Sequence, residues 1–281
     1  MTYGAPAARP NLTAADREAL EAAVAALERT SFARRLAAMT GRQIGFAGRA
    51  IPPRLQEAAS TAAAAALQAA LGAALRTLEN APARDGTRLH RALAAATGAI
   101  GGAAGLAGLP VELPVSTTIM LRAIADVARA EGEDLSHPET RIACLEVFAL
   151  GGHGENGEVL EGGYLALRGL FAKSVSDATR YVAAGGAANE AAPALTRLVA
   201  RIAERFGVAV SQKAAAQAVP ALGAISGAAV NLAFADHFQR LARGHFTVRR
   251  LERAYGQTLV REEYARIARD GGFWRDAAGA G

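Results

Sequence analysis

Three polar side chains stand within or beside apolar runs of this sequence. Glu112 lies between two prolines in GLPVELPVSTT, Lys213 precedes a long uncharged run, and Asn231 lies inside GAAVNLAFAD. Because an ionic group in such a segment costs free energy unless it is paired or faces a cavity, we expect Glu112 and Lys213 to be largely buried, each with a charged or hydrogen-bonding partner. Two roles remain open for the group: an internal network, for instance Lys213 with Glu112, and contact with a ligand.

Lysine is nearly absent from the chain. Of 31 basic residues only Lys173 and Lys213 are lysines. The abundance of Ala, Gly and Arg indicates a coding bias that turns tolerant lysines into arginine, so a remaining lysine can mark a site that needs a compact ammonium. Chance and snorkelling are the alternative explanations. We select Lys213, Lys173 and Arg180 as candidate cations for an anionic head group.

Motifs of known enzymes are absent or out of context. Residues 152–157, GHGENG, match the dinucleotide pattern GxGxxG, but a helix is expected before them where that motif needs a strand, which favours an interhelical loop. The five histidines do not fall at metal-ligand spacings, except loosely His237 beside Asp236, and adjacent helical residues point in different directions. We predict no catalytic residue, metal site or cofactor. Glu112, Asn231 and His237 join the three cations as candidate ligand-binding residues.

The composition predicts an all-α fold, a multi-helix globular bundle. Alanine, the best helix former, fills roughly a quarter of the positions, and no alternating run of strand length occurs. Residues 92–111 and 214–235 carry no charge and contain glycines at small-xxx-small spacing, which lets helices approach closely. Both lack the bulky side chains and aromatic belts of membrane spans. We therefore expect them to form a closely packed central pair of helices, with Gly101 and Gly223 at the contacts.

Turn and cap signals divide the chain into helices within one domain. Residues 1–12 read as a disordered lead-in, and residues 13–281 as a single helical domain. Helices are expected from Thr13 to near Gly41, from Pro52-Pro53 to Leu78, over 115–129, after a Ser136/Glu139 capping box, over 158–184, from Asn189 to Gly207, over 208–242 with a kink at Pro220, and after Thr247 and Thr258.

The charge is basic but dispersed. The net charge is +5, and acidic residues interleave with most of the basic ones, which argues against a nucleic-acid partner and favours an anionic membrane surface. In the tail, five arginines accompany two aromatic residues that we expect to act as interfacial anchors: Arg240, Arg243, Arg249, Arg250 and Arg253, with Phe238 and Phe246. The alternative is that internal acidic residues occupy these arginines. The N-terminus has no signal-peptide core, so we expect a cytoplasmic protein.

Two blocks of the sequence resemble the EcsC family. They are residues 109–152, LPVELPVSTTIMLRAIADVARAEGEDLSHPETRIACLEVFALGG, and residues 210–256, VSQKAAAQAVPALGAISGAAVNLAFADHFQRLARGHFTVRRLERAYG. With the helices between them, the resemblance covers roughly 85–256. The family takes its name from a protein encoded beside a bacterial ABC transporter. The resemblance implies a helical, hydrophobic bacterial protein with possible membrane association, and it carries over no catalytic residue.

These observations together favour a lipid- or membrane-associated bacterial accessory protein of unassigned activity. It would lie in the cytoplasm, peripherally on the inner face of the membrane, and hold an apolar ligand between helices. One alternative is a protein-interaction module linked to a transporter, with a protein partner in place of lipid. The other is a hydrolase with an unrecognised site, in which Glu112 and His237 would converge.

Overall fold

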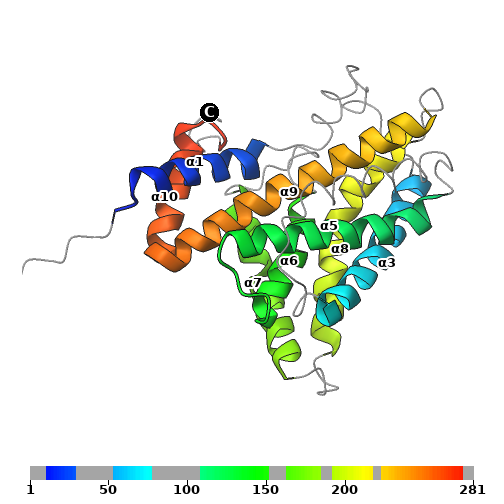
Figure 1. The fold of residues 1–281 in the computed structure, drawn as a ribbon, viewed down its shortest axis with the longest axis horizontal. Coiled ribbons are helices and arrows are strands. Elements are labelled where there is room, and N and C mark those ends of the chain that lie inside the picture. Colours follow the sequence, from blue (N-terminus) through cyan, green and yellow to red (C-terminus); the bar gives the residue numbers. More distant parts are fainter. Residues whose placement is uncertain are drawn as a thin grey trace, which may run out of the picture.

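The computed structural model describes residues 11–29, 53–77, 108–151, 163–184, 192–217 and 223–274. Within these ranges the chain forms eight helices and no strand, which confirms the all-α prediction. With the labels of Figure 1, they are α1 (Ala14–Arg29), α3 (Pro53–Thr77), α5 (Leu109–Ala130), α6 (Pro138–Leu150), α7 (Gly163–Ala183), α8 (Ala192–Gln217), α9 (Gly223–Tyr255) and α10 (Gln257–Asp270).

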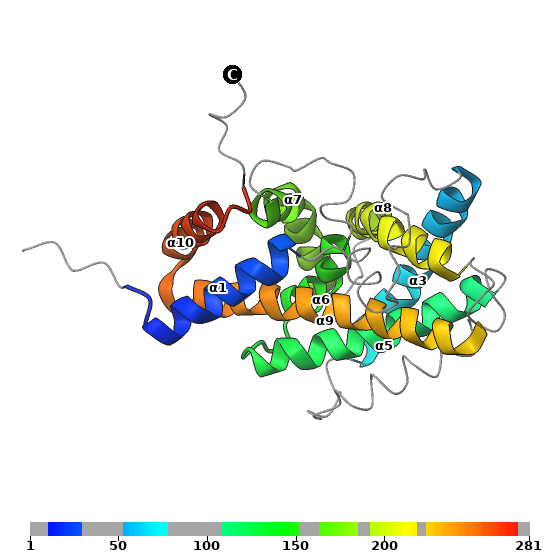
Figure 2. The same ribbon diagram turned by 90° about the horizontal axis from the view of Figure 1, so that it is seen from above.

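The longest helix, α9, runs the length of the molecule and joins its two ends (Figures 1 and 2). At one end α1 packs against α9 and α10; at the other, α3 packs against α5 and α8. Between them α6 contacts α7, α8 and α9. Four phenylalanines from α6, α8 and α9 meet at the centre with ring centroids 5.0 to 5.9 Å apart: Phe148, Phe206, Phe234 and Phe238.

The first two helices begin where the sequence predicts. Thr13 Oγ1 accepts a hydrogen bond from the Asp16 amide at 3.1 Å and donates one to the Asp16 carboxylate at 2.8 Å, so the cap holds the first turn of α1. The second predicted helix is α3, which begins at Pro53. Proline suits a first turn because the amide it lacks has no partner there.

Two predicted boundaries around α5 and α6 are wrong. α5 begins at Leu109 rather than near Val115, with Pro110 in its first turn and Pro114 inside the helix. Pro110 lies where a missing amide costs little, whereas Pro114 lies inside the helix and removes one of its backbone hydrogen bonds. The Ser136/Glu139 capping box does not form: His137 is the cap residue of α6, without a side-chain cap bond, and Pro138 opens the helix.

The predicted break at Gly207 is also wrong, because α8 continues through it to Gln217. A methyl group built on Gly207 would lie 3.1 Å from Ser60 Oγ on α3. This glycine therefore permits close packing of two helices and does not end one. α9 likewise continues past residue 242 to Tyr255, where Gly256, with a φ of 86°, separates it from α10.

Several predictions fall outside the described residues. These are the lead-in over 1–10, the end of the first helix near Gly41, most of the uncharged segment 92–111 with Gly101, the loop 152–157, the cap Asn189 and the kink at Pro220. Gly223 is the first residue of α9, but its surroundings are not described, so the packing of the two uncharged segments stays a prediction. None of the described helices combines the length and the apolar character needed to cross a membrane.

Candidate functional site

Lys213, Glu112 and Asn231 form a buried polar cluster at the contact of α8, α5 and α9. The Lys213 Nζ donates hydrogen bonds to Glu112 Oε1 at 2.7 Å and to Asn231 Oδ1 at 2.8 Å. It also lies 4.9 Å from the ring centroid of Phe234. Lys213 is fully buried, and Glu112 and Asn231 are 7% and 1% exposed. The prediction that both charged residues are buried and paired is confirmed.

A helix end favours one partner of this ion pair. Glu112 lies in the first turn of α5, where the helix dipole favours a carboxylate, whereas Lys213 lies inside α8, before its last turn. Burial nevertheless lowers the pKa of Lys213, and the Glu112 carboxylate opposes that change. The second carboxylate oxygen, Glu112 Oε2, is buried without a hydrogen-bond partner. The cluster therefore depends on one strong ion pair.

The other predicted residues do not join this cluster. Lys173 and Arg180 are exposed on α7, and Arg180 pairs with Asp177 in the same helix. Arg201 of α8, which donates a hydrogen bond to Ser174 of α7, precedes Lys213 by twelve residues, about 18 Å of helix. The candidate cations therefore occupy two separate places, one inside the bundle and one on its surface.

His237 lies apart from Glu112. It is six residues beyond Asn231 on α9, about 9 Å along the axis, and its Nε2 is 3.4 Å from the Gly151 carbonyl oxygen. Glu112 is held by Lys213 instead. The structure thus does not bring together the Glu112–His237 pair that the hydrolase alternative requires.

The prediction of an interfacial tail is wrong in its main residues. Phe238 and Phe246 are fully buried in the core and cannot anchor in a membrane. Three of the arginines bind acidic residues that the sequence places far away: Arg249 binds Glu133 at 2.8 Å, Arg250 binds Asp16 and Glu131 at 2.9 Å each, and Arg253 also binds Glu133. Only Arg240 and Arg243 of the five remain exposed without an ion pair in the described part of the chain.

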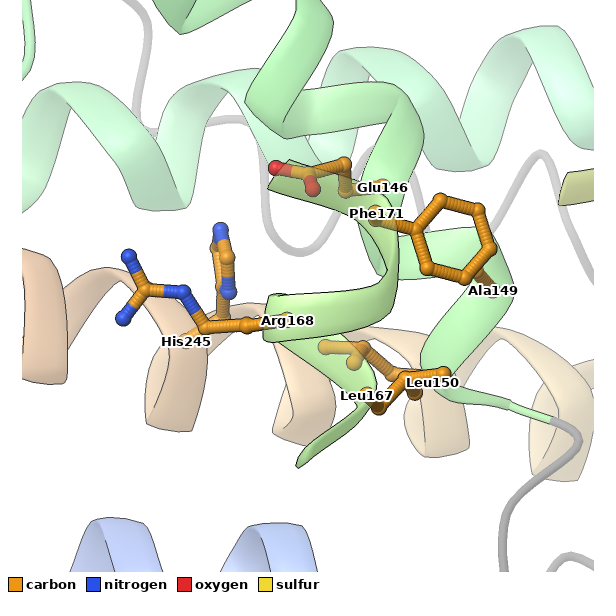
Figure 3. Close-up of a pocket in the computed structure, with 7 residues that line it drawn as sticks. All are labelled: Glu146, Ala149, Leu150, Leu167, Arg168, Phe171 and His245. Carbon is orange, nitrogen blue, oxygen red and sulfur yellow. The ribbon is translucent and has the colours of Figure 1, made fainter. Parts of the chain in front are cut away.

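A pocket that the sequence analysis missed lies between α6, α7 and α9. Figure 3 shows three polar side chains, Glu146, Arg168 and His245, on one side of it. The opposite side is apolar and is formed by Ala149, Leu150, Leu167 and Phe171. Its volume of about 10 Å³ is roughly the space that one water molecule needs.

The polar side of the pocket is held by hydrogen bonds. Tyr164 Oη and His245 Nδ1 are 3.0 Å apart, which fixes the imidazole ring, and Arg168 donates to Glu252 Oε1 at 2.8 Å. Burial raises the pKa of Glu146 to about 7, although Arg168 favours the ionised form. Burial also lowers the pKa of His245 well below its usual range, with Arg168 acting in the same direction, so the ring is neutral near pH 7.

One of these residues carries a signal that sequence reasoning could have used. Glu146 interrupts the apolar run IACLEVFAL, just as Glu112 interrupts its own segment. The rule that selected Glu112 would have selected Glu146 as well. Arg168 and His245 carry no such signal, because the residues that surround them come from helices distant in the sequence. Among the described residues, no group of three His, Cys, Asp or Glu side chains is arranged to hold a metal ion.

Residues 51–251 match the model of the EcsC protein family. The match begins well before residue 85, where the resemblance seen in the sequence begins. Neither the curated proteins nor the solved structures give a match.

Proposed function

Given that this chain belongs to the EcsC protein family, we propose that it is a membrane-associated accessory protein that docks on an anionic lipid surface. The docking face is the hairpin of α7 and α8, defined here by the exposed residues Leu170, Lys173, Arg180, Arg197 and Arg201. The tail arginines form ion pairs that stabilise the fold, so the proposed membrane contact lies instead on α7 and α8.

The single observation that carries the proposal is the charge of this hairpin. α7 contains three cations and one acidic residue, and α8 contains four cations and one acidic residue. Arg168 and Lys213 are held in ion pairs, and the exposed cations that remain include Lys173, Arg197 and Arg201. The two helices run antiparallel (Figure 1), and Arg201 donates to Ser174 Oγ at 3.0 Å. This contact brings Arg201 of α8 beside the turn of α7 that carries Lys173. Each Lys or Arg near an anionic surface contributes about 1 kcal/mol.

An apolar residue accompanies these cations. Leu170 is 57% exposed and precedes Lys173 by three residues, so the two lie on neighbouring parts of one helix face. Peripheral binding commonly combines such apolar contact with charge attraction. Leu170 therefore supports docking at the lipid interface, a mode of binding in which no helix crosses the bilayer.

At the surface of α1 and α10, several charges are balanced by ion pairs. Arg17 pairs with Glu263 between α1 and α10, and Arg266 pairs with Glu263 and Asp270. In contrast, Lys173 and Arg197 have no acidic partner among the described residues. An anionic surface would complement these exposed cations of the hairpin.

Vesicle sedimentation with a charge-matched pair of variants tests the proposal. The double variant Lys173→Glu/Arg197→Glu changes the hairpin, and Arg240→Glu/Arg243→Glu makes the same change in net charge on exposed positions of α9. We expect the wild type to sediment with phosphatidylglycerol-containing vesicles and not with phosphatidylcholine alone. The hairpin variant should lose this binding, and the α9 variant should keep most of it.

Other results would point elsewhere. Equal loss in both variants would mean that net charge, and not the hairpin, directs binding. Equal binding to both kinds of vesicle, or to neither, would favour the protein-interaction module. The separate prediction that an apolar ligand lies between helices is not tested by this experiment and stays a prediction.

A further inference from the structure

We infer that the hairpin face binds lipids whose headgroup ends in a phosphomonoester, as in phosphatidic acid, in preference to lipids with a phosphodiester headgroup. This inference rests on the proposed docking and names the class of lipid that the face selects. It is carried by three cations and one hydroxyl group on neighbouring turns of α7 and α8: Lys173, Arg197, Arg201 and Ser174.

Two guanidinium groups lie on one face of α8. Arg197 and Arg201 are four residues apart, which makes their side chains neighbours on the surface of the helix. Both are exposed, and neither forms an ion pair with a described residue. A guanidinium donates in a planar fork that matches the oxygens of a phosphate group. The two residues therefore offer several free donors to one anion.

A hydrogen bond across the hairpin orients Arg201. Its Nη1 donates to Ser174 Oγ at 3.0 Å, and Ser174 adjoins Lys173 on α7. The other nitrogens of the guanidinium remain available as donors, and the Ser174 hydroxyl can still donate its own proton. Ser174 is thus a positioning residue that holds the Arg201 fork beside the turn with the Lys173 ammonium.

The acidic residues of the hairpin do not occupy these cations. Asp177, the one acidic residue of α7, is bound by Arg180. Glu204, the one acidic residue of α8, forms no ion pair with a described residue and lies beyond Arg201, on the side away from Arg197. The positive charge of the three cations is therefore available to an anion from outside.

A phosphomonoester responds to such donors in a way that a phosphodiester cannot. Its phosphate has a second ionisation with a pKa of about 6, so at pH 7 it carries about 1.5 to 2 negative charges. Hydrogen bonds from cationic donors favour the charged form, so binding drives this ionisation further. A phosphodiester has no second proton to lose and keeps a single charge. The monoester therefore gains more from the three cations.

The neighbouring Leu170 favours a lipid over a soluble phosphate ester. It is 57% exposed and precedes Ser174 by four residues, which places it one turn away on the same side of α7. A headgroup bound at Ser174 and Arg201 would bring the apolar edge of the membrane interface to this side chain. A free phosphate ester has no apolar part that could use the contact.

Vesicle sedimentation at matched surface potential tests this inference. One set of phosphatidylcholine vesicles contains phosphatidic acid and the other phosphatidylglycerol, in mole fractions adjusted until both sets have the same zeta potential. We expect the wild type to bind the first set about tenfold more tightly, the effect of one additional charge-assisted hydrogen bond. Equal affinities would overturn the phosphomonoester preference and leave the docking proposal in place, whereas binding to neither set would overturn both.

Glycerol 3-phosphate distinguishes the lipid from a soluble source of the same group. It carries a phosphomonoester without acyl chains, so it should not displace the protein from the phosphatidic acid vesicles at the concentration of that lipid. Displacement would assign the site to a soluble ester and overturn the lipid class.

Charge-preserving variants locate the preference. Arg201→Lys keeps the charge but removes the fork, so it should lower the affinity for phosphatidic acid about tenfold, to that for phosphatidylglycerol. Arg240→Lys makes the same change at an exposed position of α9 and should leave both affinities unchanged. Ser174→Ala releases Arg201 and should weaken the preference without a change in net charge. A preference that survives both hairpin variants would overturn the assignment to these residues.

Discussion

Lys213 on α8 donates a 2.7 Å hydrogen bond to Glu112, which lies 101 residues earlier in the chain on α5. Both residues are buried, and the ion pair links two helices that also pack on α3. Burying two charges costs free energy, which a good geometry offsets. The largest loss of folding stability is therefore expected when one partner is removed and the other charge stays buried alone.

Replacing Lys213 by Met should therefore destabilise the fold strongly. The change leaves the Glu112 carboxylate buried without its cation, and the loss of one partner of a buried pair costs about 3–5 kcal/mol. Urea unfolding followed by circular dichroism measures this loss. The double variant Lys213→Met/Glu112→Leu should recover much of it, because an apolar pair needs no counter-charge. A single variant as stable as the wild type would show that the pair does not matter for folding.

Glu146→Gln should change how stability depends on pH. The folded chain holds the Glu146 proton up to about pH 7, because burial raises the pKa from its usual value of 4.5. The unfolded chain releases that proton at lower pH, so this contribution is fully present below pH 4.5 and is lost as the pH rises through 7. The loss is on the order of 3 kcal/mol, since the pKa rises from 4.5 to about 7 and one pKa unit corresponds to about 1.4 kcal/mol.

His245 acts in the opposite direction. Its folded-state pKa is lowered well below 6.5, so its contribution is present above pH 6.5 and is lost as the pH falls. Both proteins contain His245, so its contribution cancels when the unfolding free energy of Glu146→Gln is compared with that of the wild type at each pH. The stability of the variant relative to the wild type should increase from pH 5 to pH 8. A difference that stays constant with pH would contradict the assignment, and exposed Glu204→Gln controls for the substitution itself.

Glycine-to-alanine changes at two helical positions should have opposite signs. A methyl group on Gly244 would lie 2.8 Å from Leu27 Cγ and 3.2 Å from the Ala23 carbonyl oxygen, so α1 and α9 would have to separate. At Gly169 nothing lies within 4 Å of the added methyl. We expect Gly169→Ala to stabilise by about 0.5–1 kcal/mol through helix propensity. Gly244→Ala should lower the melting temperature, and a stabilising effect there would refute the close α1–α9 contact.

Asp16 should titrate at unusually low pH. Its pKa is lowered to about 2, chiefly by the hydrogen bond from Tyr255 Oη at 2.7 Å and then by Arg250. Nuclear magnetic resonance titration of the Asp16 carboxyl carbon measures this value directly. Tyr255→Phe removes the hydroxyl and should raise the pKa towards its usual 3.8. An unchanged titration in that variant would mean that Tyr255 does not hold the carboxylate.

Local signals in the sequence were sufficient for much of the architecture. Alanine content and apolar spacing predict the helical class, and Thr13 with Asp16 predicts the start of α1, because these effects act within a few residues. The cost of burying charge predicts that Glu112 and Lys213 are paired, since few other arrangements make such residues tolerable in an apolar segment. These conclusions depend on composition and short spacings, which any reader of the chain can see.

Other features were decided only when distant segments met. Gly207 looks like a helix end in the sequence, but Ser60 on another helix makes it a packing position. Arg249 looks like a free cation until Glu133, 116 residues earlier, binds it. The pocket at His245 exists only because three helices bring Glu146, Arg168 and the imidazole together. Electrostatic pairing and steric fit act through space, so the spacing of residues along the chain carries no record of them.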